Sequence, residues 1–343
     1  MYHNTFRLMT CGALLALVMV ACSSLSSTYP TPTPTAAPQQ PQPPRVEEIT
    51  FKSGTFTLVG DLWLPGGSGP FPVVLENQGS EMAARTNRGY SPDMERFLRA
   101  GYAVFSWDKP GVGKSTGRLS STRLLHERAQ ILLDAIETMK ARPDINPKRI
   151  GVAGGSQAGY VMPLALSMTQ DISFMICVSC PGMSGRDQGT YQNMALALCA
   201  GTVEGQAERR QELLGALDAA RTYETYEQYL HYREAIDALF STAPQAPRGY
   251  GSEIIPEEAW QQNDPEQEAW WNPIEVMEQA TIPVLVLLGD QDVRMDPFQA
   301  EVAWRKALEA SGNAYSRVEL FPNANHSLVI SETGCPDADQ QWL

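Results

Sequence analysis

The sequence predicts an α/β fold in which helices cover both faces of a mostly parallel sheet. Three observations lead to this class. Apolar runs typical of strands alternate with amphipathic segments typical of helices over most of the chain. The strand-like runs are continuously apolar, which is typical of strands buried on both sides of a parallel sheet. About 300 residues follow the N-terminal region, enough for one large core or a core with an insertion.

The expected elements follow in chain order. Residues 47–67 predict two strands joined around Ser53 and Gly54, where a turn is favoured. A strand, a helix closed by Gly101, a strand and a long amphipathic helix are expected next, at residues 72–77, 92–100, 102–108 and 119–141. The alternation continues with a strand, a helix and a strand at residues 149–155, 157–169 and 173–180. The last strand, helix and strand are expected at residues 282–290, 297–312 and 316–322.

Residues 181–280 interrupt this alternation with helical, Glu-rich sequence. Because a strand follows directly, we interpret the segment as an insertion into one sheet, not as a boundary between two domains. It contains 17 Asp and Glu residues against 6 Lys and Arg, in a chain of formal net charge −13. Its aromatic residues fit either ordinary helix packing or the lining of a pocket: Tyr223, Tyr226, Tyr229, Tyr232, Trp260, Trp270 and Trp271.

The N-terminus has the features of a secretory signal. A single cation, Arg7, precedes an apolar run of fourteen residues, Leu8–Ala21, which is short for a membrane span. The run ends in Met-Val-Ala before Cys22, which resembles the lipobox of bacterial lipoproteins. We therefore expect residues 1–21 to be a lipoprotein signal peptide and Cys22 to carry lipid, anchoring the protein to the membrane outside the cytoplasm. An ordinary cleaved signal with an incidental cysteine is the alternative.

Residues 22–44 contain seven prolines and no apolar periodicity, so we expect a Pro/Thr/Ser-rich linker before a folded domain at 45–343. The acidic balance weighs against nucleic acid as a partner. The sequence contains no Cys/His ligand cluster, and neither a metal nor a cofactor is expected. Cys177 and Cys180 lie in an apolar run and are expected to be buried packing residues, whereas Cys199 and Cys335 could form a disulfide.

The stretch PGVGKST at 110–116 is close to a phosphate-binding loop but departs from it at one decisive position. The motif G-x-x-x-x-G-K-[ST] requires a glycine where this chain has Asp108. A carboxylate there would face the phosphate anion. In addition, Gly117 and Arg118 interrupt the helix that should start at Lys114. We therefore expect no phosphate at this loop.

The stretch GVAGGSQAGY at 151–160 has the pattern of a nucleophilic serine on a strand-to-helix turn. Small residues two positions before and after the serine let the neighbouring backbone come close, and here these are Gly154 and Ala158 around Ser156. The motif is G-x-S-x-A instead of the usual G-x-S-x-G. A glycine-rich turn without chemistry is the alternative.

A serine nucleophile also needs a base and an acid. Of four histidines, His326 follows the last predicted strand, at the sheet edge where Ser156 is expected. Asp290, Asp292 and Asp296 follow the strand before it. Asp296 stands directly before a proline that opens a helix, so helix capping explains it. Asp292 and Asp290 both remain candidates from their position alone.

The chain order Ser156, Asp292, His326, each after a predicted strand, resembles the α/β-hydrolase superfamily over residues 45 to about 329. The resemblance selects Asp292 as the acid. It also implies a helical cap at 182–280 and makes DKPGVGKSTG at 108–117 a loop beside the active site. In this superfamily the backbone N–H after the nucleophile, here that of Gln157, forms the oxyanion hole together with one from the loop ENQGSE, here that of Gly79 or Ser80.

The resemblance implies a serine hydrolase that cleaves carboxylic esters through an acyl-enzyme, without metal or cofactor. A small neutral ester is the expected substrate, because the acidic cap would repel anions. A thioesterase, acyltransferase or peptidase of the same fold remains open, as does a non-catalytic surface binding lipoprotein. The sequence does not indicate an oligomeric state.

Overall fold

A computed structural model describes residues 43–85, 92–120, 123–199 and 271–336, with 225–227, 230–231, 234, 257–258 and 341–342. All of these belong to one compact unit, Pro41–Leu343. The expected signal peptide, Cys22 and nearly all of the linker lie outside the described residues. So do most of the expected cap and its aromatic residues, apart from Tyr226 and Trp271.

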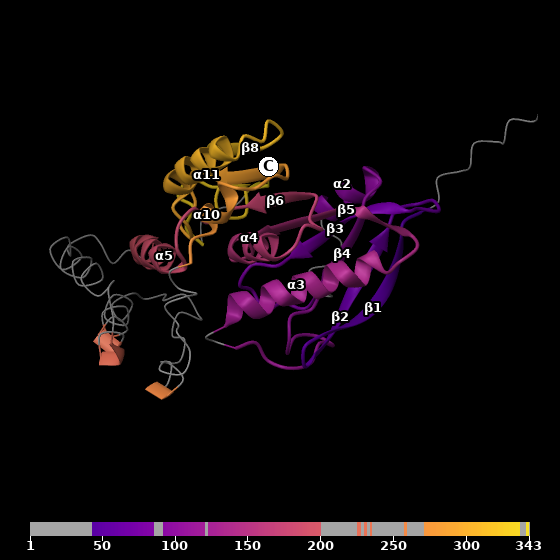
Figure 1. The fold of residues 1–343 in the computed structure, drawn as a ribbon. Helices are drawn as coiled ribbons and strands as arrows, with labels where there is room; N and C mark the ends of the chain where they lie inside the picture. Colours follow the sequence, from indigo (N-terminus) through magenta and orange to yellow (C-terminus); the bar gives the residue numbers. More distant parts are fainter. Residues whose placement is uncertain are drawn as a thin grey trace, which may run out of the picture. The chain divides into compact units, whose positions relative to one another are not determined.

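The described residues form an eight-stranded sheet in the order β1-β2-β4-β3-β5-β6-β7-β8 (Figure 1). Two antiparallel pairings, β1 with β2 and β2 with β4, join the first strands, and the remaining pairings are parallel. The predicted mostly parallel α/β sheet is therefore confirmed. The strand bounds are β1 Arg45–Ser53, β2 Phe56–Leu64, β3 Phe71–Asn77, β4 Ala103–Trp107, β5 Ile145–Gly155, β6 Phe174–Val178, β7 Val284–Gly289 and β8 Arg317–Phe321.

Helices cover both faces of the sheet. Side chains alternate between the two faces along each strand, so one strand can supply apolar side chains to the core on either side. On β4, Ala103 and Phe105 belong to the main apolar core, which includes α3 (Leu124–Lys140) and α4 (Ala158–Met168). Val104 points the other way, into a separate cluster with Met94 and Leu98 of α2 (Pro92–Arg99). Figure 1 shows α3 and α4 side by side along one face. The other described helices are α5 (Gly185–Cys199), α10 (Pro273–Met277) and α11 (Pro297–Ser311).

Two element bounds differ from the sequence expectation by four residues or more. The long helix begins at Leu124, not at Leu119, because the Glu127 carboxylate accepts a hydrogen bond from the Ser120 backbone N–H at 2.7 Å and holds the preceding segment out of the helix. Strand β5 begins at Ile145, four residues early, because Ile145 pairs with Phe71 before a register shift. A short antiparallel pair, β9 (Val329–Ile330) with β10 (Gln341–Trp342), was not expected.

The expectation that two cysteines are buried inside the protein is confirmed. Cys177 and Cys180 are both fully buried free thiols. Cys199 and Cys335 form a disulfide that joins the end of α5 to the segment after His326. No helix among the described residues has the length and apolar character needed to cross a membrane.

Candidate active site

Ser156 lies on a sharp turn between β5 and α4. Its φ of 55° is in the left-handed region, which a non-glycine residue rarely adopts, and its N–H donates to the Val178 carbonyl at 3.0 Å. A Cβ at Gly154 would lie 2.2 Å from the Asn77 carbonyl oxygen and 2.7 Å from the Ala158 Cβ. Only glycine fits at 154, and its missing side chain leaves room for the methyl of Ala158. This close packing explains why G-x-S-x-A can form the turn.

The structure brings Asp292 and His326 together. The Asp292 Oδ2 lies 2.7 Å from His326 Nδ1, and Oδ1 accepts hydrogen bonds from the N–H groups of Arg294 and Met295 at 2.7 and 3.1 Å. The carboxylate is fully buried, whereas the imidazole is 18% exposed. Such a carboxylate fixes the imidazole orientation and leaves Nε2 available for proton transfer.

Asp290 differs from Asp292 although it is only two residues away. Among the described residues no hydrogen bond joins Asp290 to His326, and the buried Oδ1 of Asp290 has no partner. Its backbone N–H donates to the Phe321 carbonyl at 3.0 Å, so its place in the structure is at the β7–β8 edge. Asp296 caps α11 through bonds from the Phe298 and Gln299 N–H groups, as expected.

The loop that carries His326 is fastened on both sides of the imidazole. The buried Asn325 accepts hydrogen bonds through Oδ1 from the N–H groups of Ser327 and Val329, at 2.9 and 3.2 Å. Its own N–H donates to the Val329 carbonyl at 2.9 Å. A Cβ at Gly289 would lie 2.3 Å from the Ala324 carbonyl oxygen, so the end of β7 packs directly on this loop.

Ser156, Asp292 and His326 follow β5, β7 and β8, whose carboxyl ends lie at the same edge of the sheet. Among the described residues no hydrogen bond joins Ser156 to His326. Hydrogen bonds of this kind often form only when substrate binds. The geometry therefore provides an oriented imidazole and a serine on a strained turn at one sheet edge.

Gly79 lies next to the serine. A Cβ at Gly79 would be 3.3 Å from the Ser156 Cβ and 3.3 Å from the Gly155 carbonyl oxygen. Within the described part of the chain, the N–H groups of Gly79, Ser80 and Gln157 have no hydrogen-bond acceptor. Backbone donors of this kind beside a nucleophile can bind a developing oxyanion.

Two buried cations hold the loop that contains Gly79. The Lys109 Nζ donates to the Gly79 carbonyl at 2.6 Å and also to the Glu81 carbonyl. Arg128, on α3, donates to the carbonyls of Gly79 and Gln78. It also donates to the side-chain oxygens of Asn77, just before the loop, and of Gln157, just after Ser156. Burial lowers the pKa of the Arg128 guanidinium to about 10, although the nearby Glu81 opposes this shift.

Sequence reasoning missed Lys109 and Arg128. Lys109 lies in the glycine-rich stretch, where only Lys114 drew attention. The position of Arg128 could have indicated its buried polar contacts. It lies three residues after Leu125 and three before Ile131, on the apolar face of α3, where a cation must find polar partners inside the protein.

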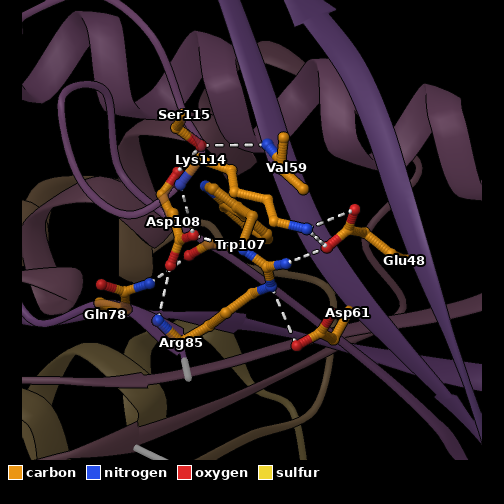
Figure 2. Close-up of polar contacts among 9 residues, drawn as sticks. All are labelled: Glu48, Val59, Asp61, Gln78, Arg85, Trp107, Asp108, Lys114 and Ser115. Carbon is orange, nitrogen blue, oxygen red and sulfur yellow. Dashed lines mark hydrogen bonds and ion pairs between the residues drawn. The ribbon is translucent and has the colours of Figure 1, made fainter. Parts of the chain in front are cut away.

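Figure 2 shows how the glycine-rich loop is attached. The fully buried Asp108 accepts hydrogen bonds from the backbone N–H and guanidinium of Arg85, whose guanidinium also pairs with Glu48 and Asp61. Lys114 pairs with Glu48, with Nζ 2.6 Å from Oε2. Lys114 thus joins the glycine-rich loop to β1.

The described start of the expected cap segment contacts the loop that carries Asp292. On α5, the Tyr191 hydroxyl donates to the Asp292 carbonyl at 2.9 Å, and the Gln188 side chain donates to the Arg294 carbonyl. The disulfide fixes the end of the same helix to Cys335. Burial, together with Asp296 and Asp292, raises the pKa of Tyr191 to about 12.

The described residues contain no group of three or more His, Cys, Asp or Glu side chains arranged to hold a metal ion. This sheet edge brings together a half-buried serine, a half-buried histidine and a fully buried aspartate, with backbone N–H donors. Together they can activate a hydroxyl for attack on a carbonyl carbon and stabilise the resulting oxyanion.

Comparison with protein families gives one match over most of the chain. The profile of the X-Pro dipeptidyl-peptidase (S15) family matches residues 54–325. The matched range includes Ser156 and Asp292 and ends one residue before His326.

Two curated relatives are similar over a shorter part. "Hydrolase LUC6" of a Fusarium species is 32% identical over 148 residues, which cover 40% of this chain and 33% of that protein. The "20-hydroxy-prefusarin hydrolase FUS2" of Gibberella moniliformis is 31% identical over 132 residues, covering 36% and 30%. The chain therefore spans about a third of the length of these curated relatives.

Solved structures share the fold at low identity. The Pyrococcus furiosus esterase Pf2001 aligns with a TM-score of 0.50 and 17% identity over 82% of this chain and 84% of that one. The α/β hydrolase GrgF of Penicillium aligns with a TM-score of 0.50 and 20% identity over 83% and 91%. An acylaminoacyl peptidase of Pyrococcus horikoshii gives 0.50 and 16%, over 84% and 38%. The sheet described above is that of an α/β-hydrolase fold.

Proposed function

Because the chain belongs to the X-Pro dipeptidyl-peptidase (S15) family, and is therefore a hydrolase, we propose that it cleaves carboxylic esters through an acyl-serine intermediate. The observation that carries this proposal is the pairing of Asp292 with His326 at the sheet edge that also bears Ser156. Ser156 is the nucleophile, His326 the general base and acid, and Asp292 the residue that orients the imidazole.

In the first half of the reaction, the Ser156 Oγ attacks the carbonyl carbon while His326 Nε2 takes its proton. The backbone N–H groups of Gln157 and of Gly79 or Ser80 bind the oxyanion. The tetrahedral intermediate collapses when the imidazolium gives its proton to the leaving alcohol, and the acyl group stays on Ser156. A water molecule, deprotonated by His326, then attacks the acyl group, and the imidazolium returns the proton to the Ser156 Oγ as the acid is released. Asp292 stabilises the imidazolium in both halves.

Peptide cleavage is the second candidate, and the family match favours it. The same residues carry out amide hydrolysis if the site binds the peptide and protonates the leaving amine. We place the ester first because the acidic cap suits a neutral acyl group. A non-catalytic binding protein on this fold is disfavoured because it has no need of a strained serine near a paired imidazole.

Turnover of matched substrates tests the proposal. The purified protein should be given p-nitrophenyl butyrate and Ala-Pro-p-nitroanilide, and kcat/KM compared for the wild type, Ser156→Ala and His326→Ala. We expect the ester to be hydrolysed, and each variant to lose on the order of 10⁴ to 10⁶ of the turnover. Hydrolysis of the anilide with little ester hydrolysis would replace the esterase assignment by the peptidase one. Activity retained by Ser156→Ala would refute the mechanism.

A further inference from the structure

Two buried cationic side chains, those of Lys109 and Arg128, donate hydrogen bonds to the loop beside the proposed nucleophile. The carbonyl of Gly79 accepts hydrogen bonds from Lys109 Nζ at 2.6 Å and from Arg128 at 3.0 Å, and the carbonyl of Gln78 accepts from the second Arg128 nitrogen. Lys109 and Arg128 are 4% and 5% exposed. The Gly79 carbonyl thus receives two cationic donors away from solvent, and charge-assisted bonds of this kind are the stronger ones.

Hydrogen bonds to these two carbonyls also determine where the N–H of the same peptide group points. In a trans peptide the N–H points opposite to the C=O of the preceding residue. The carbonyl of Gln78 shares its peptide group with the N–H of Gly79, and the carbonyl of Gly79 shares its group with the N–H of Ser80. Both N–H groups are the candidate oxyanion donors, and both are therefore aimed away from the cations.

Arg128 also bonds to the side chain of Gln157, the residue whose backbone N–H is the third candidate donor. Its guanidinium donates to the Gln157 side-chain oxygen and, at 2.8 Å, to the Asn77 Oδ1 at the end of β3. One buried side chain thus connects the loop after β3 with the residue that follows Ser156. In the described structure no carboxylate forms an ion pair with this guanidinium, so its hydrogen bonds go to neutral oxygens.

We propose that Arg128 is a positioning residue for the oxyanion hole: with Lys109, it fixes the direction of the Gly79 and Ser80 N–H groups and polarises their peptide groups toward stronger donation. This inference rests on the proposed serine-hydrolase function. The charge lies on the carbonyl side, so an oxyanion on the N–H side is stabilised through the amide dipoles and by the positive field of the two cations. The ground-state ester, which carries no full charge, gains less.

The test compares Arg128→Gln and Arg128→Lys with a control of the same residue type and burial. Arg85→Gln serves as the control, because Arg85 is also 5% exposed but pairs with the carboxylates of Glu48, Asp61 and Asp108 (Figure 2). For each protein, the melting temperature, kcat and KM for p-nitrophenyl butyrate, and the Ki of a trifluoromethyl ketone should be measured. The ketone forms a tetrahedral oxyanion on the serine and so reports the oxyanion hole directly.

We expect Arg128→Gln to lower kcat by about 10- to 100-fold, less than the loss of a whole oxyanion donor, while KM changes less than about threefold. Its Ki for the ketone should rise in parallel with the loss in kcat/KM. Arg128→Lys should lose less, because it keeps the charge but reaches fewer carbonyls. Arg85→Gln should lower the melting temperature while its kcat and ketone Ki remain within about threefold of wild type.

Three results would overturn the inference. One is kcat and ketone Ki for Arg128→Gln within threefold of wild type. Another is a loss in the control that equals the loss at Arg128. The third is that both Arg128 variants fail to fold while Arg85→Gln folds, which would make Arg128 a purely structural residue. If the wild type itself hydrolyses neither ester nor anilide and does not bind the ketone, the proposed function has failed, and not this inference alone.

Discussion

Asp292 holds His326 through one carboxylate oxygen while backbone N–H groups hold the other. Oδ2 lies 2.7 Å from the imidazole Nδ1, and Oδ1 is bound by the N–H groups of Arg294 and Met295. Because each oxygen has its own partners, the carboxylate has a single orientation. Asp290 provides a natural control, since it lies half-buried at the same sheet edge, is not bonded to the imidazole, and has no described partner for its buried Oδ1.

The first prediction separates these two aspartates. Asp292→Asn should lower kcat roughly 10⁴-fold, because an amide stabilises the wrong imidazole tautomer and cannot balance the imidazolium. Asp290→Asn should change kcat less than about threefold. Steady-state kinetics with p-nitrophenyl butyrate, together with melting temperatures for both variants, provide the measurement. A larger loss at Asp290 would show that the acid has been assigned to the wrong residue.

The second prediction concerns α5 and alkaline pH. The pKa of Tyr191 is raised to about 12 in the folded protein, mainly by burial, whereas an unfolded tyrosine titrates near pH 10. The neutral hydroxyl therefore contributes its full stability below about pH 10, and that contribution is lost as the pH rises toward 12. The stability difference between wild type and Tyr191→Phe should accordingly shrink over this range.

Urea unfolding of both proteins between pH 8 and 11.5 measures this difference. Tyr315→Phe is the matched control, since it removes the same hydroxyl from a side chain that is 84% exposed. A constant difference between wild type and Tyr191→Phe across the range would contradict the assigned environment of Tyr191.

Much of the fold could be predicted because its signals are local. The strands are apolar runs bounded by turn residues, and the Ser156 turn has small residues at fixed offsets. The motif indicates that position 154 needs a glycine. The reason is a close approach to the Asn77 carbonyl oxygen on another strand, which the sequence does not reveal. In the same way, the choice between Asp290 and Asp292 depended on a resemblance, because both residues stand at the same strand end.

The positioning cations could not be predicted, for a related reason. The partners of Arg128 are carbonyl oxygens about fifty residues away, and a backbone carbonyl leaves no trace in the sequence. The strand β5 began early because of its pairing with Phe71, which is again a tertiary effect. In each case the sequence shows which residue is present, but not which distant group it contacts in the fold.

The third prediction concerns the expected cap at 182–280. Its 17 acidic and 6 basic residues should disfavour anionic substrates. We expect a higher kcat/KM for p-nitrophenyl butyrate than for p-nitrophenyl hemisuccinate, of similar acyl length. The preference should shrink as the salt concentration rises, because exposed charges are screened. Equal values at low salt, or a preference for the anion, would mean that the cap charge only solvates the exterior.

The fourth prediction concerns the N-terminus. We expect cleavage before Cys22 and lipid attachment to it, which would place the protein in the detergent phase of a Triton X-114 extract. Cys22→Ala should shift it to the aqueous phase, whereas Cys11→Ala, within the apolar run, should not. Intact-mass analysis that finds a mature N-terminus elsewhere and no lipid would contradict the expected anchoring.

The central claim is that Ser156 is an activated nucleophile oriented by His326 and Asp292, and covalent trapping tests it most directly. The protein should be treated with a fluorophosphonate, and the modified peptide identified by mass spectrometry in the wild type, Ser156→Ala and His326→Ala. We predict one adduct, on Ser156, with no labelling of Ser156→Ala and much slower labelling of His326→Ala. An unlabelled wild type, or an adduct on another residue that persists in Ser156→Ala, would contradict the account.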